Sequence, residues 1–304
     1  MSSFSRTVCG CWLVLAALLA GGARAETANP PPTPSPPVRV TYSSRGAGMN
    51  DIPVGAYRVP DSNVLISGHQ KGGAVGLLFG PVGILAQSAI NSQAGKQAVS
   101  GARDALRFDV PKQAEDETRS VLQSGRYGQI FTLDDGSDGP QLTVYAYASI
   151  TFVTDTDVRP YVILKAVPKP EHSGDHQQTV RYICCAGEAL PLAGDNGLTA
   201  NGGALLQKIF AQEVDDAVNL MLTDAAHSYT RDEQNLVAVD AHFPFVRNRL
   251  RVTGYELSED RDSIVFAPKL GSLIVFSGVE KMDKASISYR PATKKDAPFN
   301  ILPN

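Results

Sequence analysis

The sequence lacks several features that would point to particular partners. Its 28 lysines and arginines form no long basic tract, and 31 aspartates and glutamates outnumber them. Because phosphate contacts need clustered basic side chains, this composition argues against a nucleic-acid partner. No apolar run reaches the roughly 20 residues that a membrane-spanning helix needs. The remaining classes are proteins that work without nucleic acid and without a simple helical membrane span.

Catalytic and cofactor motifs are also missing. There is no G-x-G-x-x-G fingerprint, and the Walker A order fails around Gly95 and Lys96 because Ile90 stands where its first glycine is required. The sequence contains no G-x-S-x-G nucleophile elbow and no H-E-x-x-H zinc motif. We therefore expect no nucleotide or other cofactor and a function that is not enzymatic.

Two loops contain residue types that bind metals. His172, Asp175 and His176 are the kinds of ligand that zinc uses, but no distant partner completes the set. Residues 134–139 are similar to an acidic calcium loop, yet Gly136 and Tyr145 occupy positions where an EF-hand needs ligands. We interpret both loops as solvated turns and expect no metal.

The first 40 residues indicate export. Residues 1–25 have the basic start, short apolar core and Ala23-Arg24-Ala25 cleavage site of a secretory signal peptide. Residues 26–40 contain a proline-rich tract, which is typical of a semi-rigid linker. These features predict an exported protein of the periplasm or cell envelope of a bacterium. Association with a membrane is one way in which it could be held there.

Cys184 and Cys185 are the two cysteines that follow the signal peptide. Neighbouring residues on a strand point to opposite faces of the sheet, and a bridge between them would depart from ordinary disulfide geometry. We expect two small, partly buried thiols. An intermolecular disulfide and a redox role are the alternatives.

Strict alternation of apolar and polar residues over 142–153 predicts a half-buried strand. Strands at 161–167 and 179–185 would complete an antiparallel meander. Apolar residues at helical spacing over 203–227 predict a helix that covers it. A short helix is predicted to begin at Pro111 and to end at Gly125, and apolar spacing over residues 84–106 predicts another helix. The predicted fold class is α+β, an antiparallel β-meander covered by helices within a domain spanning residues 41–234.

The C-terminal part of the chain has a different pattern. Short strands are expected at 249–255, 262–268 and 271–279, separated by tight turns. Residues 235–290 are therefore predicted to be β-rich, either as a small all-β module or as an extra β-layer. Residues 291–304 are expected to form an irregular tail.

Glycines at every fourth position mark the most unusual segment, residues 68–83. On a helix they would lie along one face, where a bare backbone lets another element approach closely. The positions involved are Gly68, Gly72, Gly76 and Gly80, with the apolar residues Leu77, Leu78 and Phe79. The pattern is similar to the glycine zippers of bacterial envelope proteins, and that resemblance implies membrane contact or self-association.

A straight membrane span is disfavoured at this segment. Its uncharged apolar run of about 14 residues is shorter than the roughly 20 that a spanning helix needs, and Pro81 interrupts it. An interfacial hairpin, a packed or oligomerising helix and a flexible loop are the three open readings.

These observations predict a non-enzymatic cell-envelope protein, periplasmic or peripherally membrane-bound, with a structural, assembly or partner-binding role. Its partner would be an envelope protein, a membrane surface or a second copy of the chain. One alternative is a hydrolase with a non-local active site, which requires a deep polar cleft with perturbed pKa values. The other is a small-ligand-binding protein, which requires a largely apolar pocket between sheet and helix.

Overall fold

The strand β5 (Gln141–Phe152) lies inside a mixed sheet of fourteen strands. The computed structural model describes residues 36–48, 51–53, 56–68, 104–133, 139–169, 178–185, 187–270 and 276–303. The sheet order is β13-β9-β10-β11-β12-β7-β6-β5-β1-β4, with β14 on β10, β8 on β6, and β3 joining β2 to β5.

The other strands have the following bounds: β1 (Val38–Ser43), β2 (Tyr57–Arg58), β3 (Val64–Ser67), β4 (Phe131–Leu133), β6 (Asp157–Lys169), β7 (Val180–Cys185), β8 (Leu190–Pro191), β9 (Leu236–Ala241), β10 (Leu250–Glu259), β11 (Ser263–Pro268), β12 (Val279–Asp283), β13 (Ser288–Pro291) and β14 (Phe299–Ile301). The antiparallel pairs β5–β6 and β6–β7, which the alternation predicts, are present.

The predicted fold class, α+β with an antiparallel meander covered by helices, is wrong for the whole sheet. Strands β1 and β3 pair with β5 in parallel, and β12 pairs with β7 in parallel, so β9–β14 belong to the same sheet as β5–β7. The described residues contain only two α-helices. The protein is therefore mostly one large mixed β-sheet. Residues that are paired between its parallel strands, such as Val40 and Leu142, lie far apart in sequence. The local pattern of apolar and polar residues carries no information about such pairs.

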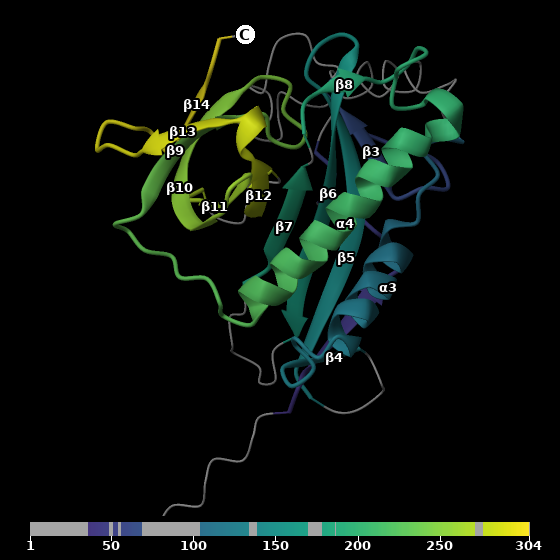
Figure 1. Ribbon diagram of the computed structural model, residues 1–304, viewed down its shortest axis with the longest axis vertical. Coiled ribbons are helices and arrows are strands. Elements are labelled where there is room, and N and C mark those ends of the chain that lie inside the picture. The colour runs from purple at the N-terminus through teal and green to yellow at the C-terminus, as the bar shows by residue number, and fades with distance from the viewer. Residues whose placement is uncertain are drawn as a thin grey trace, which may run out of the picture. The chain divides into compact units, whose positions relative to one another are not determined.

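The two helices lie on one face of the sheet, in front of β5 and β6 in the view of Figure 1. Helix α3 (Val110–Gln123) starts where the Asp109 side chain accepts a hydrogen bond from the Lys112 backbone N–H at 3.2 Å. Helix α4 (Ala204–Ala225) packs its apolar stripe on β6 and β7. The Phe108 and Phe210 rings pack against each other, with their centroids 5.2 Å apart. Of the helix expected at 84–106, residues 84–103 lie outside the described residues, and 104–106 form a turn.

The face of β5 opposite the helices is buried as well. Every residue from Ala146 to Phe152 is buried, so the half-buried strand expected from the alternation is half-buried only in its first part. The hydroxyls on this face bond to each other: Ser67 Oγ and Thr151 Oγ1 lie 3.1 Å apart, and Phe245 N–H donates to Thr151 Oγ1 at 2.9 Å. The polar residues of β5 thus face the loop that contains Phe245. The alternating pattern predicts that this face of the strand is exposed to water.

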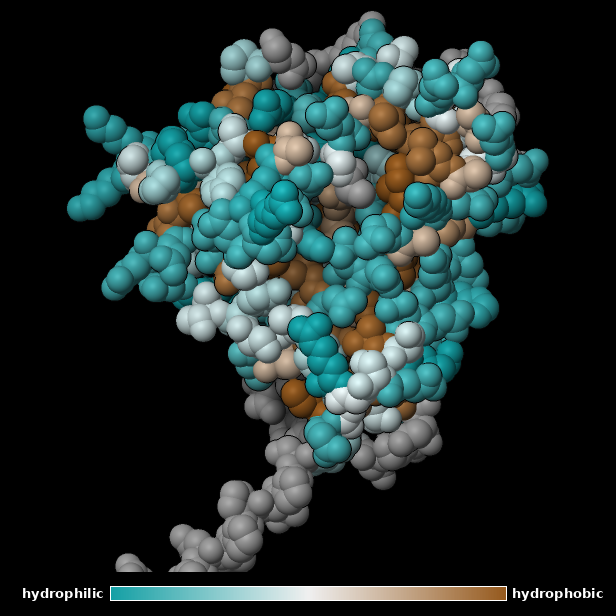
Figure 2. Space-filling model, in the orientation of Figure 1, coloured by the Kyte–Doolittle hydropathy of each residue, from teal (hydrophilic) through white to brown (hydrophobic). Residues whose placement is uncertain are grey.

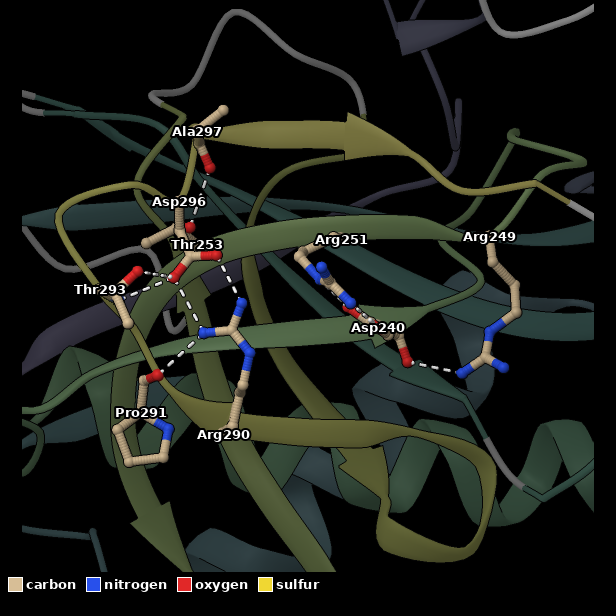
Figure 3. Close-up of polar contacts among 9 residues, drawn as sticks. All are labelled: Asp240, Arg249, Arg251, Thr253, Arg290, Pro291, Thr293, Asp296 and Ala297. Atoms are coloured by element: carbon tan, nitrogen blue, oxygen red, sulfur yellow. Dashed lines mark hydrogen bonds and ion pairs between the residues drawn. The ribbon is translucent and has the colours of Figure 1, made fainter.

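The end of the chain is ordered by ion pairs, not irregular as expected for residues 291–304. Strand β14 pairs with β10, and the loop before it is held by Asp296. Figure 3 shows Arg290 and Thr293 turned toward Asp296, with guanidinium–carboxylate distances of 2.9 and 2.5 Å. Beside it, Arg251 binds both oxygens of Asp240 at 2.7 Å. The Asp296 contacts thus hold the last loop to β13, and strand pairing attaches β14 to β10, whereas the Arg251–Asp240 ion pair joins β10 to β9.

The surface of the helix-bearing face is mainly hydrophilic, with apolar residues in separate patches (Figure 2). Leu205, in the first turn of α4, is 43% exposed. Of the helices in the described ranges, none has both the length and the hydropathy that crossing a bilayer requires.

Candidate ligand-binding cavity

A cavity of about 590 Å³ lies where the C-terminal end of α4 meets the sheet. The end of α4 lies over the start of β7 (Figure 1). Most of the wall is apolar and comes from the ends of β6 and β11 and the starts of β5, β7 and β12. Its apolar residues include Phe131, Leu142, Ala166, Pro168, Val180, Tyr229, Ala267 and Val279. The volume falls in the range of about 300–1,000 Å³ that is typical of small-molecule sites.

Asp224 is the acidic group of the cavity wall. It lies in the last turn of α4 with its side chain 8% exposed. Tyr182 Oη donates to its Oδ2 at 3.1 Å, and Arg231 Nη2 lies 3.4 and 3.5 Å from its two oxygens. A carboxylate near a helix C-terminus meets the negative end of the helix dipole. Tyr182 and Arg231 therefore supply the donors that stabilise this charge.

Tyr182 acts as a permanent donor in this contact. Burial, and then the charge of Asp224 and the hydrogen bond to it, raise the pKa of Tyr182 well above its usual range. The phenol consequently keeps its proton at any physiological pH. Burial also raises the pKa of Tyr229, which lines the same cavity.

The turn after α4 brings further polar groups to the cavity. His227 has a left-handed backbone with φ of 57°, at a position where helices more often carry glycine. Its N–H donates to the Asp224 carbonyl at 2.8 Å, and Ser228 N–H donates to the Thr223 carbonyl at 3.2 Å. This cap reverses the chain, so that Arg231 reaches back to the helix it has just left.

The arrangement suits recognition of a polar group better than acid–base chemistry. Among the described residues that line the cavity, Asp224 is the only carboxylate, and Tyr182 and Arg231 already hold it. A second carboxylate, as in paired acid–base catalysis, is absent from that lining. No set of three or more His, Cys, Asp or Glu side chains in the described ranges is arranged to hold a metal.

A second buried polar cluster lies on the opposite face of the sheet. Asp51, 2% exposed, has its carboxylate 2.9 Å from Lys165 Nζ and 3.2 Å from Arg181 Nη2. Lys165 is on β6 and Arg181 on β7, so the cluster ties the loop around Asp51 to two strands. Its charges are used in these contacts, and we assign it a structural role.

The structure describes the glycine segment only at its first residue. Of its predicted site residues, Gly68 is described, whereas Gly72, Gly76, Gly80, Leu77, Leu78 and Phe79 lie outside the described residues. Gly68 has φ of 85°, and a Cβ there would lie 2.3 Å from the Phe152 carbonyl oxygen. A close backbone approach between β3 and β5 therefore requires glycine at this position.

The cysteines lie on opposite faces of β7, as expected. Cys184 packs among the apolar residues on the helix side of the sheet, and Cys185 packs against the hydrophobic residues on the other face. Both are free thiols. His172, Asp175, His176 and residues 134–138 lie outside the described residues, so the interpretation of those two loops stays a prediction.

The sequence patterns missed the residues of the cavity. Tyr182 was part of a predicted strand, and Asp224 of a predicted helix, but His227, Tyr229 and Arg231 follow the helix without a motif. The acidic residue in the last helical turn was the one available signal. Comparisons of the chain with family models, with curated proteins and with solved structures found no match.

Proposed function

We propose that this chain is a non-enzymatic, exported protein of the bacterial cell envelope that binds a small molecule in the cavity beside α4. The observation that carries this proposal is the combination of a mainly apolar wall with a fixed carboxylate, Asp224, held by Tyr182 and Arg231. Small-molecule sites typically join an apolar lining to a few placed polar groups. The export signal in residues 1–25 supports the location.

The charges at the cavity favour an uncharged, amphipathic ligand. Asp224 and Arg231 lie close enough to offset each other, and Arg181, the other arginine of the lining, is paired with Asp51. A ligand with a net charge therefore gains attraction from one member of the Asp224–Arg231 pair and repulsion from the other. A hydroxyl or amide head group can donate to Asp224 and accept from Arg231 at the same time. The apolar body of the ligand would pack against Tyr229, Val180 and Val279.

The glycine segment completes the proposal as the part of the chain that contacts a membrane surface, an envelope protein or a second copy of the chain. Its four-residue glycine period supports close packing against a neighbouring surface. Fractionation of cells and size-exclusion chromatography of the mature protein test this part. Mature protein that is wholly soluble, monomeric and indifferent to lipid vesicles would contradict it.

Binding of an uncharged fluorescent probe tests the cavity itself. Titration with N-phenyl-1-naphthylamine should give saturable fluorescence with one site per chain. Thr179→Trp places a large side chain in the half-buried lining and should abolish that signal. Thr132→Trp, the same change at a half-buried position of β4 outside the lining, is the matched control and should bind as the wild type does.

Two results would overturn parts of this proposal. An absence of saturable binding, or equal binding by Thr179→Trp and the wild type, would refute ligand binding in the cavity. Tighter binding of the anionic probe 1-anilinonaphthalene-8-sulfonate than of the neutral probe would retain the cavity as a site and refute the uncharged ligand class.

A further inference from the structure

A second, much smaller cavity lies on the face of the sheet opposite the helices. Its volume is about 10 Å³, and its lining includes Arg159, Tyr161, Cys185, His242 and Glu280. These residues come from β6, β7, β12 and the segment after β9. The cavity thus lies beside the parallel pair β7–β12, where the C-terminal strands join the rest of the sheet.

Three of the lining residues carry buried polar atoms without a hydrogen-bond partner among the described residues. These atoms are Glu280 Oε1, His242 Nδ1 and Arg159 Nε. Glu280 is 2% exposed and Arg159 is 4% exposed, so bulk water does not reach either side chain freely. Native proteins rarely leave such atoms unpaired, because each one loses its hydration on burial.

The protonation states of these groups make a neutral guest the better fit. Burial, and then the charges of Arg159 and Arg249, lower the pKa of His242 to about 4, so its ring is neutral at pH 7. Burial raises the pKa of Glu280 well above its usual range, which favours the protonated carboxyl over the carboxylate. Burial also raises the pKa of Cys185, to about 12, against a lowering effect of Arg159. The Arg159 guanidinium therefore shares this cavity with a neutral imidazole and a neutral thiol at pH 7.

We propose that this cavity binds one internal water molecule that bridges Arg159, His242 and Glu280. A cavity of about 10–15 Å³ is the minimum that holds one water, and such a water needs two to four polar partners. The water accepts from Arg159 Nε–H and bonds to His242 Nδ1 and to the Glu280 carboxyl. A metal ion is the poorer occupant, since no metal-binding set of side chains exists in the described ranges.

The position of this water gives it a structural consequence. Glu280 belongs to β12, Arg159 to β6, and His242 to the segment after β9. The bridge therefore links the C-terminal strands to the central strands beside their backbone pairing at β7–β12. This inference is independent of ligand binding in the larger cavity.

Water-selective nuclear Overhauser spectroscopy of the intact, isotopically labelled protein tests the proposal. In the wild type, the backbone amide protons of Glu280 and Cys185 should show cross-peaks with a water of long residence time. Absence of these cross-peaks from the wild type would overturn the proposal without the use of any variant.

Two substitutions at Glu280 separate a bound water from proton exchange with the carboxyl. Glu280→Gln has no acidic proton but keeps hydrogen-bonding capacity, so its cross-peaks should persist. Glu280→Met has no such capacity and should lose them. The control Glu188→Met, at an exposed glutamate, should keep them. Loss of the cross-peaks in Glu280→Gln, or their persistence in Glu280→Met, would contradict a bridging water.

Discussion

Asp224 and Tyr182 form the contact on which the cavity's polar character depends. The Asp224 side chain is 8% exposed, and Tyr182 is buried at 3% exposure. Tyr182 donates to Asp224 across the interface between β7 and α4. The pair therefore joins sheet to helix as well as forming part of the proposed binding site.

Removal of the acceptor should destabilise the fold measurably. Asp224→Ala leaves the buried Tyr182 hydroxyl without that partner, and we expect the free energy of unfolding to fall by about 1–3 kcal/mol. Urea denaturation measures this change in the free energy of unfolding. In the Tyr182→Phe background the same substitution should cost less, because no orphan hydroxyl is left behind. Equal costs in both backgrounds would show that the hydrogen bond contributes nothing to stability.

Glu117 on α3 should give the protein a specific pH dependence. Burial, and then a hydrogen bond with Asp215 on α4 and the charge of that residue, raise the pKa of Glu117 from 4.5 to about 7. Between these values the unfolded chain releases the proton first, so stability should fall as pH rises through this window and level off above about 7.

Urea midpoints measured from pH 4.5 to 8 would test this dependence. Glu117→Gln, which keeps a neutral side chain at all pH values, should flatten that part of the profile. Glu188→Gln, at an exposed glutamate, is the control and should leave the profile unchanged. A Glu117→Gln profile as steep as that of the wild type would exclude Glu117 as the origin.

At the scale of elements, the start of α4 depends on close contact with the chain before α3. Gly203 has φ of 82°, and a Cβ there would lie 2.6 Å from the Ala105 Cβ. Its neighbour Gly202 also has a positive φ, 70°, but a Cβ at that position would meet nothing within 4 Å. The two glycines thus share a left-handed backbone, which would strain any other residue, and they differ in contact.

Alanine substitutions at these two glycines should separate strain from contact. Gly202→Ala should cost about 1–2 kcal/mol for the left-handed backbone alone. Gly203→Ala should cost a further ~1–3 kcal/mol, because the added methyl overlaps Ala105 in a packed region. Thermal unfolding of both variants measures the difference. Equal melting temperatures would mean that the contact with Ala105 imposes no restriction.

Elements with strong local signals were predictable from the sequence. The Pro111 start and the Gly125 end place α3 closely, and the apolar stripe at 203–227 places α4 within a few residues. Strands β5, β7 and β11 lie where the sequence predicts strands, at residues 142–153, 179–185 and 262–268. Strand β14 was missed because residues 299–301 are short and carry no alternation, and their pairing with β10 depends on Asp296 and the loop it holds.

At the scale of the whole molecule, β11 explains why the C-terminal strands are not a separate body. Val265 and Ala267 pack in the core on the helix side, whereas Ile264 and Phe266 pack in the C-terminal core. The two cores therefore lie on opposite faces of the same strand. Lys281 of β12 also binds Asp216 of α4 at 2.6 Å.

We expect the folded unit to unfold in a single transition. Tyrosine fluorescence, which reports mainly on the helix-side core, and amide exchange in β9 and β10 should give the same urea midpoint. Two separated midpoints would instead support the independent C-terminal module that the sequence left as one alternative.

The global pairing and the cavity could not be predicted from local patterns. Val38 and Phe131 are paired, as are Ile183 and Glu280, and neither pair has a sequence signal that names its partner. The cavity depends on those pairings, because its wall combines the start of β7 with the start of β12. Local residue types indicate strands and helices, and the three-dimensional contacts decide which strands are neighbours.

The place of β1 in the sheet has a mechanical consequence. The strand follows the proline-rich tract directly and lies between β4 and β5, parallel to both. Val38 N–H donates to Ile130 on one side at 2.7 Å, and Arg39 N–H donates to Pro140 on the other at 2.8 Å. Tension along the tract would load these hydrogen bonds together in shear. A pulling force on the N-terminal side would therefore be resisted by hydrogen bonds on both edges of β1.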